Sequence, residues 1–229
     1  MNRFLTLAVL LSSLCYFGCS NEAANNNTET EEKREAGESV VREKAPEKKR
    51  IVFFGNSLTA AYGLDPNQGF AGLISQRIDS LELDYQVVNA GLSGETTAGG
   101  RERIDWILQQ PVNIFILELG GNDGLRGIDP EASYENLQAI IDKVREKFPE
   151  AKIVLAGMEA PPNMGPEFTQ AFRAIYPKLA KENDVTLIPF LLDKVGGEPH
   201  LNLADGIHPN PEGHKIVAET IWSVLEGLL

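Results

Sequence analysis

A serine at the end of an apolar run is the first residue with evident chemistry. The stretch FFGNSLTAAYGL (residues 53–64) runs through apolar residues to Gly55 and then presents Ser57. A β-strand that ends in this way places a hydroxyl at its carboxyl end, where it can act as a nucleophile. The stretch lacks the second glycine of the G-x-S-x-G elbow, because Thr59 occupies that position. Ser57 is therefore either the nucleophile of another catalytic design or a cap for the following segment.

A serine nucleophile needs a base, and the sequence offers one histidine with a suitable partner. His208 follows Asp205 by three residues, in a turn before the last predicted helix. Asp205 can accept the proton of one ring nitrogen, which leaves the other nitrogen free to take the Ser57 proton. His200 and His214 have no carboxylate at comparable spacing. Taken alone, Asp-x-x-His equally fits a helix cap with a surface histidine.

Acyl transfer also needs donors for a developing oxyanion, and two further segments could supply them. Gly94, in a Ser-Gly-Glu-Thr turn, offers a backbone N–H with no side chain in front of it. Asn122, in the segment GGND (120–123), offers a side-chain amide. With the Ser57 N–H they could form a three-donor oxyanion hole. The alternatives are a capped strand-to-helix turn at Gly94 and a simple β-turn at Asn122.

Alternating strand and helix patterns must position these residues. Strands are predicted at 51–54, 85–91, 113–120, 152–158 and 185–190, and helices at about 68–81, 96–110, 131–147, 166–183 and 211–228. Near-continuous apolar strands in strict alternation with helices indicate a parallel sheet covered on both faces. We therefore predict a flavodoxin-like, three-layer α/β/α fold with a five-stranded parallel sheet. In such sheets the ligand site lies beyond the carboxyl ends of the strands, where Ser57, Gly94 and Asn122 fall.

In this order, these residues resemble the blocks of the SGNH, or GDSL, hydrolases. The serine, glycine, asparagine and histidine of that family correspond to Ser57, Gly94, Asn122 and His208. The resemblance implies the SGNH hydrolase fold, a Ser57–His208–Asp205 triad and an oxyanion hole made by Ser57, Gly94 and Asn122. It also implies that the nucleophile needs no second glycine.

The resemblance covers about 51–229 and is closest to the bacterial thioesterase I/lysophospholipase/arylesterase branch. It is carried there by ELGGNDGLRG (118–127), AIYPKLAKENDV (174–185) and DGIHPN (205–210). It implies hydrolysis of acyl esters or thioesters, with the acyl chain lying between the segments 124–130 and 159–165. The candidate substrate-binding residues in these segments are Leu125, Ile128, Pro162 and Met164. These four could equally face the core.

Asn56 departs from the G-D-S-L pattern, in which an aspartate precedes the serine. Asparagine keeps an acceptor oxygen but loses the charge and adds two donors. If the aspartate only orders the turn, little activity is lost, and this is our expectation. Two other functions stay open at this point. One is a carbohydrate O-acetylesterase, and the other is a catalytically impaired surface binding module, for which Asn56 is the only support.

Composition excludes several other classes. The net charge of −12 argues against nucleic-acid binding, because that activity needs a basic surface. The only two cysteines are Cys15 and Cys19, so we expect no disulfide in the domain at 51–229. His208 and His214 are six residues apart without a convincing third ligand, so we expect no metal and no cofactor. The expected partner is a small acyl substrate, and the expected state is a monomer.

The N-terminus predicts export. Residues 1–19 resemble a lipoprotein-type signal peptide, with an apolar run at 4–14 and Cys19 directly after Gly18. We expect lipidation of Cys19 and anchoring at the bacterial cell envelope, on the periplasmic or outer surface. An ordinary secretory signal removed together with its cysteine is the alternative. Residues 20–50 contain no aromatic residue and are predicted to be a disordered tether.

Overall fold

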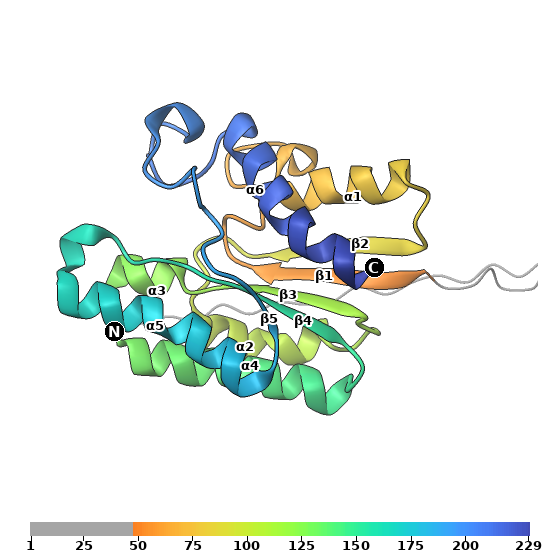
Figure 1. Cartoon of the computed structure of the whole chain (residues 1–229), viewed down its shortest axis with the longest axis horizontal. Helices are drawn as coiled ribbons and strands as arrows, with labels where there is room; N and C mark the ends of the chain where they lie inside the picture. Colours follow the sequence, from red (N-terminus) through yellow and green to blue (C-terminus); the bar gives the residue numbers. More distant parts are fainter. Residues whose placement is uncertain (1–47) are drawn as a thin grey trace, which may run out of the picture. The chain divides into compact units, whose positions relative to one another are not determined.

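Five parallel strands form one sheet in the computed structural model, which describes residues 48–229 (Figure 1). The strands are β1 (Lys49–Gly55), β2 (Tyr85–Gly91), β3 (Ile114–Glu118), β4 (Lys152–Ala156) and β5 (Thr186–Ile188). Their order across the sheet is β2-β1-β3-β4-β5. The chain therefore winds in both directions from β1, which confirms the predicted three-layer α/β/α class. The switch in direction lies between β1 and β3, where ligands bind in sheets of this kind.

Helices cover both faces of the sheet. The helices α1 (Phe70–Ser80) and α6 (Pro211–Leu225) lie together on one face. On the other face lie α2 (Thr97–Ile107), α4 (Pro130–Lys147) and α5 (Pro166–Asn183). The short α3 (Gly121–Arg126) follows β3, and four 3-10 turns complete the described elements: η1 (Pro66–Gln68), η2 (Pro162–Met164), η3 (Pro199–Leu201) and η4 (Glu226–Leu228).

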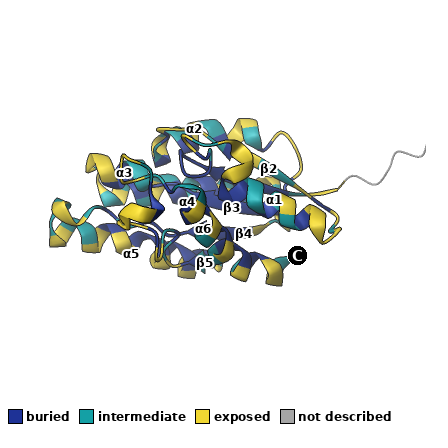
Figure 2. Cartoon of the chain, turned by 90° about the horizontal axis from the view of Figure 1, so that it is seen from above, coloured by how far each residue is buried: buried dark blue, intermediate teal, exposed yellow. Residues whose placement is uncertain are grey.

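The central strands are buried on both faces, as their apolar sequences predict. Every residue of β3 is buried (Figure 2). The residues of β1 from Ile51 to its end are buried as well. The edge strand β2 is less covered, and only Tyr85 and Ala90 among its residues are buried. The register pairs Gly55 of β1 with both Gly91 of β2 and Glu118 of β3. The three strands thus end side by side, and the residues that follow them share one edge of the sheet.

Most elements are a few residues shorter than predicted, and three differences from the sequence prediction have an evident structural basis. β1 begins at Lys49, two residues inside the predicted tether, because the backbone of Arg50 pairs with Asn113. The segment after β3 is the helix α3 and not a β-turn. Its N-cap, Gly120, has φ of +113°, a left-handed conformation that lets the chain turn directly into a helix. The last helix ends at Leu225 and continues as the single turn η4.

Parts of the predicted organisation lie outside the described residues. The signal peptide at 1–19, with Cys19, and almost all of the tether at 20–50 belong to this group. Within residues 48–229, no helix combines the length and apolar character needed to cross a bilayer.

Candidate active site

Ser57 lies in a buried turn directly after β1. Its exposed fraction is 8%, and that of Asn56 beside it is 1%. The turn continues from the strand through backbone hydrogen bonds from Ala60 to Asn56 and from Tyr62 to Ser57, both 3.0 Å long. The Ser57 side chain therefore occupies a fixed position at the carboxyl edge of the sheet.

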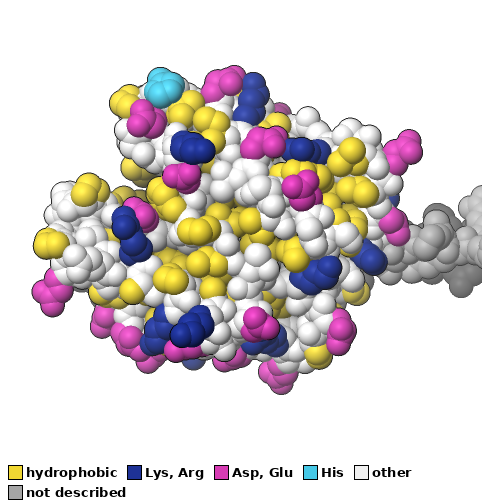
Figure 3. All heavy atoms as spheres, in the orientation of Figure 1, with side chains coloured by type: hydrophobic (Ala, Val, Ile, Leu, Met, Phe, Trp, Pro, Cys, Tyr) yellow, Lys and Arg dark blue, Asp and Glu magenta, His cyan; other side chains and the backbone are white. Residues whose placement is uncertain are grey.

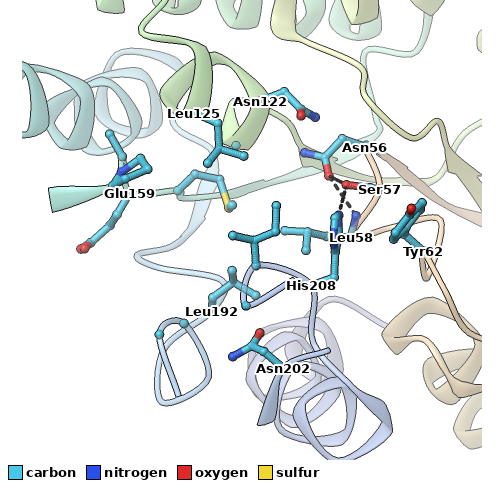
Figure 4. Close-up of a pocket in the computed structure, with 18 of the residues that line it drawn as sticks. Asn56, Ser57, Leu58, Tyr62, Asn122, Leu125, Glu159, Leu192, Asn202 and His208 are labelled. Carbon is cyan, nitrogen blue, oxygen red and sulfur yellow. Dashed lines mark hydrogen bonds between the residues drawn. The ribbon is translucent and has the colours of Figure 1, made fainter. Parts of the chain in front are cut away.

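The loop between β5 and α6 brings His208 to this serine. His208 Nε2 lies 2.9 Å from Ser57 Oγ (Figure 4). On the other side of the ring, His208 Nδ1 lies 2.7 Å from Asp205 Oδ2. The Tyr62 ring packs against the imidazole, with ring centroids 4.6 Å apart. The three side chains predicted from the sequence thus form one continuous line, although 151 positions separate Ser57 from His208. Such a line can move a proton from the serine hydroxyl to the imidazole.

Asp205 is held as a carboxylate. Partial burial raises the pKa of its carboxyl group, but three hydrogen bonds outweigh this effect and lower the pKa below its ordinary value. The donors are the Ile207 N–H, the His208 ring and the His208 N–H. A charged Asp205 fixes the tautomer of His208 that leaves Nε2 free to accept a proton.

The three predicted oxyanion donors face the same cavity. Within residues 48–229, neither the Ser57 N–H nor the Gly94 N–H donates to a protein acceptor. Gly94 adopts φ of +82°, which only glycine adopts freely. Asn122 lies in the first turn of α3, and its Nδ2 donates to Glu95 O at 2.9 Å. One amide hydrogen of Asn122 remains for a bound oxygen.

Charged side chains stabilise the loop that contains Gly94 and Glu95 through hydrogen bonds. The buried carboxylate of Glu95 pairs with Arg103, with two 2.6 Å hydrogen bonds. Arg126 donates to Gly94 O at 3.1 Å. The fully buried Asp123 accepts from both the N–H and the hydroxyl of Thr97, at the start of α2. These contacts hold the Gly94–Glu95 peptide and the residues after it, so that the loop carrying the Gly94 N–H is in place before any ligand arrives.

A largely apolar cavity of about 580 Å³ opens beside Ser57. It lies between the segment after β4 and the loop after β5, and Figure 3 shows the surface indented between these two parts. The lining includes Leu125 and Pro162, as predicted for an acyl pocket. Ile128 and Met164 do not line it, and Met164 instead packs against Gly127. Ala160 and Pro161, in the predicted segment 159–165, line it as well. Apolar lining residues outside the two predicted segments are Leu58, Met158, Phe190, Leu192 and Ile207.

Glu118 is a second feature that the sequence reasoning missed. It is the only charged residue of β3, its exposed fraction is 1%, and its carboxylate binds the Ser57 turn. Burial raises its pKa from 4.5 to about 7, although four hydrogen bonds act in the opposite direction. The signal in the sequence is a single acid at the end of an apolar strand, because an unpaired charge is costly to bury.

The other two histidines lie apart from this site. His214 is buried in α6 and accepts from the Phe70 N–H at 3.2 Å. Burial, and to a smaller extent the nearby His208, lowers its pKa to about 4, so it is neutral and structural. His200 is exposed in the loop after β5. Residues 48–229 hold no group of three or more His, Cys, Asp or Glu side chains placed to bind a metal.

Comparisons with known proteins give a consistent result. Residues 53–216 match the GDSL-like Lipase/Acylhydrolase family. Esterase TesA of Pseudomonas aeruginosa is 39% identical over 180 residues, which are 78% of this chain and 89% of that protein. Thioesterase 1/protease 1/lysophospholipase L1 of Escherichia coli is 37% identical and is covered to 84%, again by 78% of this chain.

Solved structures agree with these sequence relatives. The crystal structure of TesA superposes with a TM-score of 0.75 and is covered completely by 79% of this chain. AlinE4, described as an SGNH-hydrolase family esterase, superposes with a TM-score of 0.66 at 37% identity, and 81% of this chain covers all of it.

Proposed function

The chain belongs to the GDSL-like lipase/acylhydrolase family and is a carboxylic-ester hydrolase, and from this premise we propose that Ser57 is its nucleophile. The predicted family resemblance is thereby confirmed. One observation carries the proposal for Ser57, namely the line of hydrogen bonds from its Oγ through His208 to Asp205. Ser57 also lies beside a cavity that can hold an acyl group.

In the proposed mechanism, His208 removes the hydroxyl proton while Ser57 Oγ attacks the acyl carbonyl carbon. The oxyanion that forms receives hydrogen bonds from the Ser57 N–H, the Gly94 N–H and the Asn122 amide. The bond to the leaving oxygen or sulfur then breaks, as His208 returns the proton to that atom. An acyl group is left on Ser57. Water attacks it with His208 again as base, which releases the acid and restores the serine, while Asp205 stabilises the imidazolium throughout.

The cavity favours an acyl chain over a sugar as the group held beside Ser57. Leu125 and Leu192 border it (Figure 4), as do Met158, Phe190 and Ile207, and this apolar wall outweighs the polar side chains of Glu159 and Asn202 that also line it. The names of the relatives include esterase, thioesterase, lysophospholipase and arylesterase. We therefore propose that the substrates are esters or thioesters with an aliphatic acyl chain longer than acetyl.

A substrate panel tests this proposal. It contains p-nitrophenyl esters from acetate to laurate, an acyl-CoA, a lysophospholipid and an acetylated sugar. We expect kcat/KM to rise from acetate to a medium chain, since each buried methylene contributes about 0.8 kcal/mol. Leu192→Trp should narrow the cavity and reduce the ratio of octanoate to acetate turnover. Leu81→Trp, at an exposed position after α1, should leave that ratio unchanged. Preference for the acetylated sugar, or an unchanged ratio in Leu192→Trp, would contradict the acyl-chain proposal.

The proposed location follows from the N-terminal segment alone. The Gly18-Cys19 junction after an apolar run supports lipid attachment at Cys19 and anchoring at the bacterial envelope. An anchored domain of this kind would meet its substrates at or near a membrane surface.

A further inference from the structure

Exposed apolar side chains gather around the mouth of the cavity beside Ser57. Within residues 48–229, six large hydrophobic residues are exposed, and four of them lie in the segments that follow strands at the carboxyl edge of the sheet: Tyr62, Leu92, Leu125 and Ile207. Three of the four also line the cavity, and Figure 4 shows Tyr62 and Leu125 at its border. Leu92 lies next to Ser93, which lines the cavity as well. We call these four residues the apolar rim.

The other two exposed residues of this kind lie at the opposite edge of the sheet. Leu81 is at the end of α1, shortly before β2 begins, and Trp106 is in the last turn of α2, before β3 begins. Neither of them lines the cavity. Single apolar residues on a surface are ordinary, whereas a group around one opening indicates an interaction site. The rim, drawn from four separate segments, is such a group.

The position of the rim limits what can cover it during turnover. A folded protein or a second copy of this chain on the rim would close the opening that leads to Ser57. A lipid layer differs from these, because the layer itself contains the acyl groups that the cavity accepts. Leu125 and Ile207 belong both to the rim and to the cavity wall, so the apolar surface is continuous from one to the other. An acyl chain can therefore pass from the layer into the cavity without crossing water.

The charge of the chain indicates which lipids the rim fits. The net charge of −12 opposes binding to an anionic surface, which attracts basic segments. Binding through the rim would instead come from the burial of apolar side chains at the boundary between headgroups and acyl chains. Such binding needs no anionic lipid, and salt screens it little. A zwitterionic lipid surface meets these conditions.

The length of the preceding chain allows the rim to face the surface that would hold the anchor. The seven-residue strand β1 begins at Lys49 and ends next to the Ser57 turn, so the preceding chain joins the domain at the end opposite the rim (Figure 1). A strand of this length spans about 23 Å. Residues 20–47 lie between Cys19 and the described residues, and at about 3.3 Å per residue they can reach about 90 Å. This reach exceeds the length of the strand several-fold.

We propose that the apolar rim docks on a zwitterionic lipid surface and passes acyl chains from that surface directly to Ser57. The inference rests on the proposed function of Ser57 and its cavity. It assigns to the exposed side chains of the rim a role that the chemistry at Ser57 does not use, namely to keep the mouth of the cavity in contact with the lipid layer.

Leu92 allows a kinetic test of docking, because its side chain belongs to the rim but does not line the cavity. Its exposed fraction of 51% is matched by 53% for Leu81 at the opposite edge. Leu92→Gln replaces the apolar side chain by a neutral one of similar size, and Leu81→Gln is the control. Turnover of p-nitrophenyl laurate in phosphatidylcholine vesicles is compared with that of p-nitrophenyl butyrate in solution. We expect the ratio of the two rates to fall at least about fivefold in Leu92→Gln and to stay unchanged in Leu81→Gln. An unchanged ratio in Leu92→Gln, or an equal fall in both variants, would contradict docking through the rim.

Contact with lipid is measured directly in the full chain carrying Ser57→Ala, so that no turnover is needed. Residues 48–229 contain no cysteine, so Leu92→Cys and Leu81→Cys each provide one position in the domain for an environment-sensitive fluorophore. With phosphatidylcholine vesicles, the label at position 92 should shift its emission to the blue, whereas the label at position 81 should not. Raising the salt concentration from about 0.05 M to about 0.5 M should leave this shift in place.

No shift at position 92, or equal shifts at both positions, would refute docking through the rim. A shift that appears without vesicles and grows with protein concentration would assign the rim to a second copy of this chain and would also refute the lipid proposal. The activity of Ser57→Ala tests the proposed function separately. If that variant stays active, the proposed nucleophile is wrong, whatever the labels report. An inactive Ser57→Ala with no shift at position 92 refutes docking alone.

Discussion

Two buried titratable groups should make opposite contributions to the pH dependence of stability. The folded-state pKa of Glu118 is raised from 4.5 to about 7, mainly by burial. The folded native state therefore binds more protons than the unfolded chain in this range, and stability falls as the pH rises from about 4.5 to about 7. The pKa of His214 is lowered from 6.5 to about 4, again mainly by burial. There the unfolded chain binds more protons, and stability rises as the pH rises from about 4 to about 6.5.

The two contributions are of similar size. Each group differs by about 2.5 pKa units between its folded and ordinary values, which corresponds to roughly 3 kcal/mol. Near pH 5.5 each group changes the free energy of unfolding with a slope of about 1 kcal/mol per pH unit, close to the maximum for one proton. The two slopes have opposite signs. The wild-type protein should therefore show almost no net slope from these two groups between pH 5 and pH 6.

Single substitutions should reveal the two pH dependences of stability, which cancel each other in the wild-type protein. With Glu118→Gln, only the His214 contribution remains, so the free energy of unfolding should rise with pH. With His214→Asn, which keeps an acceptor near the Phe70 N–H, it should fall with pH. The two slopes should differ by about 2 kcal/mol per pH unit, whatever each variant loses in absolute stability. Other carboxyl groups contribute equally to both variants and cancel in this difference.

Urea unfolding of each protein, followed by circular dichroism at half-unit steps from pH 4.5 to pH 7.5, measures these slopes. Glu219→Gln serves as the control, because the Glu219 carboxylate is exposed and pairs with Arg77 on the surface. Its curve should parallel that of the wild type. Equal slopes in Glu118→Gln and His214→Asn would refute the reasoning, since they would mean that neither buried group carries its perturbed pKa in the folded protein.

Three further predictions concern catalysis and location. Ser57→Ala should leave less than about 1% of the esterase activity and shift Tm by only a few degrees. The control Ser223→Ala, at an exposed position on α6, should keep full activity. More than about 1% residual activity in Ser57→Ala would show that Ser57 is not the nucleophile. Asn122→Ala should lower kcat by about 10²–10³ with a smaller change in KM, as expected for an oxyanion donor; a change confined to KM would assign Asn122 to substrate binding. Cys19→Ser should abolish acyl modification of the full chain, measured by mass spectrometry, and its partitioning into detergent, measured by phase separation. The kinetics of ester hydrolysis should not change. Mature protein that begins after residue 19 and stays in the aqueous phase would refute lipid anchoring.

The sequence by itself determined the class of fold and one local part of the site. Apolar runs that alternate with helical patterns predicted all five strands and the five long helices. Strands buried on both faces of a sheet are continuously apolar, and helices that cover the sheet have apolar residues at helical spacing. Asp205 and His208 could be paired from their spacing, since a short turn brings such neighbours together. Ser57, Gly94 and Asn122 could be proposed from their positions after predicted strands, and family resemblance then linked them to one site, which the sheet places at one edge.

The tertiary structure alone decided which distant side chains meet. The contact between Asn56 and Glu118 depends on the register of β1 with β3, which pairs Gly55 with Glu118. Periodicity in either strand contains no information about this register. The acyl cavity likewise depends on the path of the loop at 189–210, which places Leu192 and Ile207 in the wall. Met164 lies against Gly127 instead, although its residue type suits a pocket equally well. Residue type states what a side chain can do, whereas strand register and loop path decide what it faces.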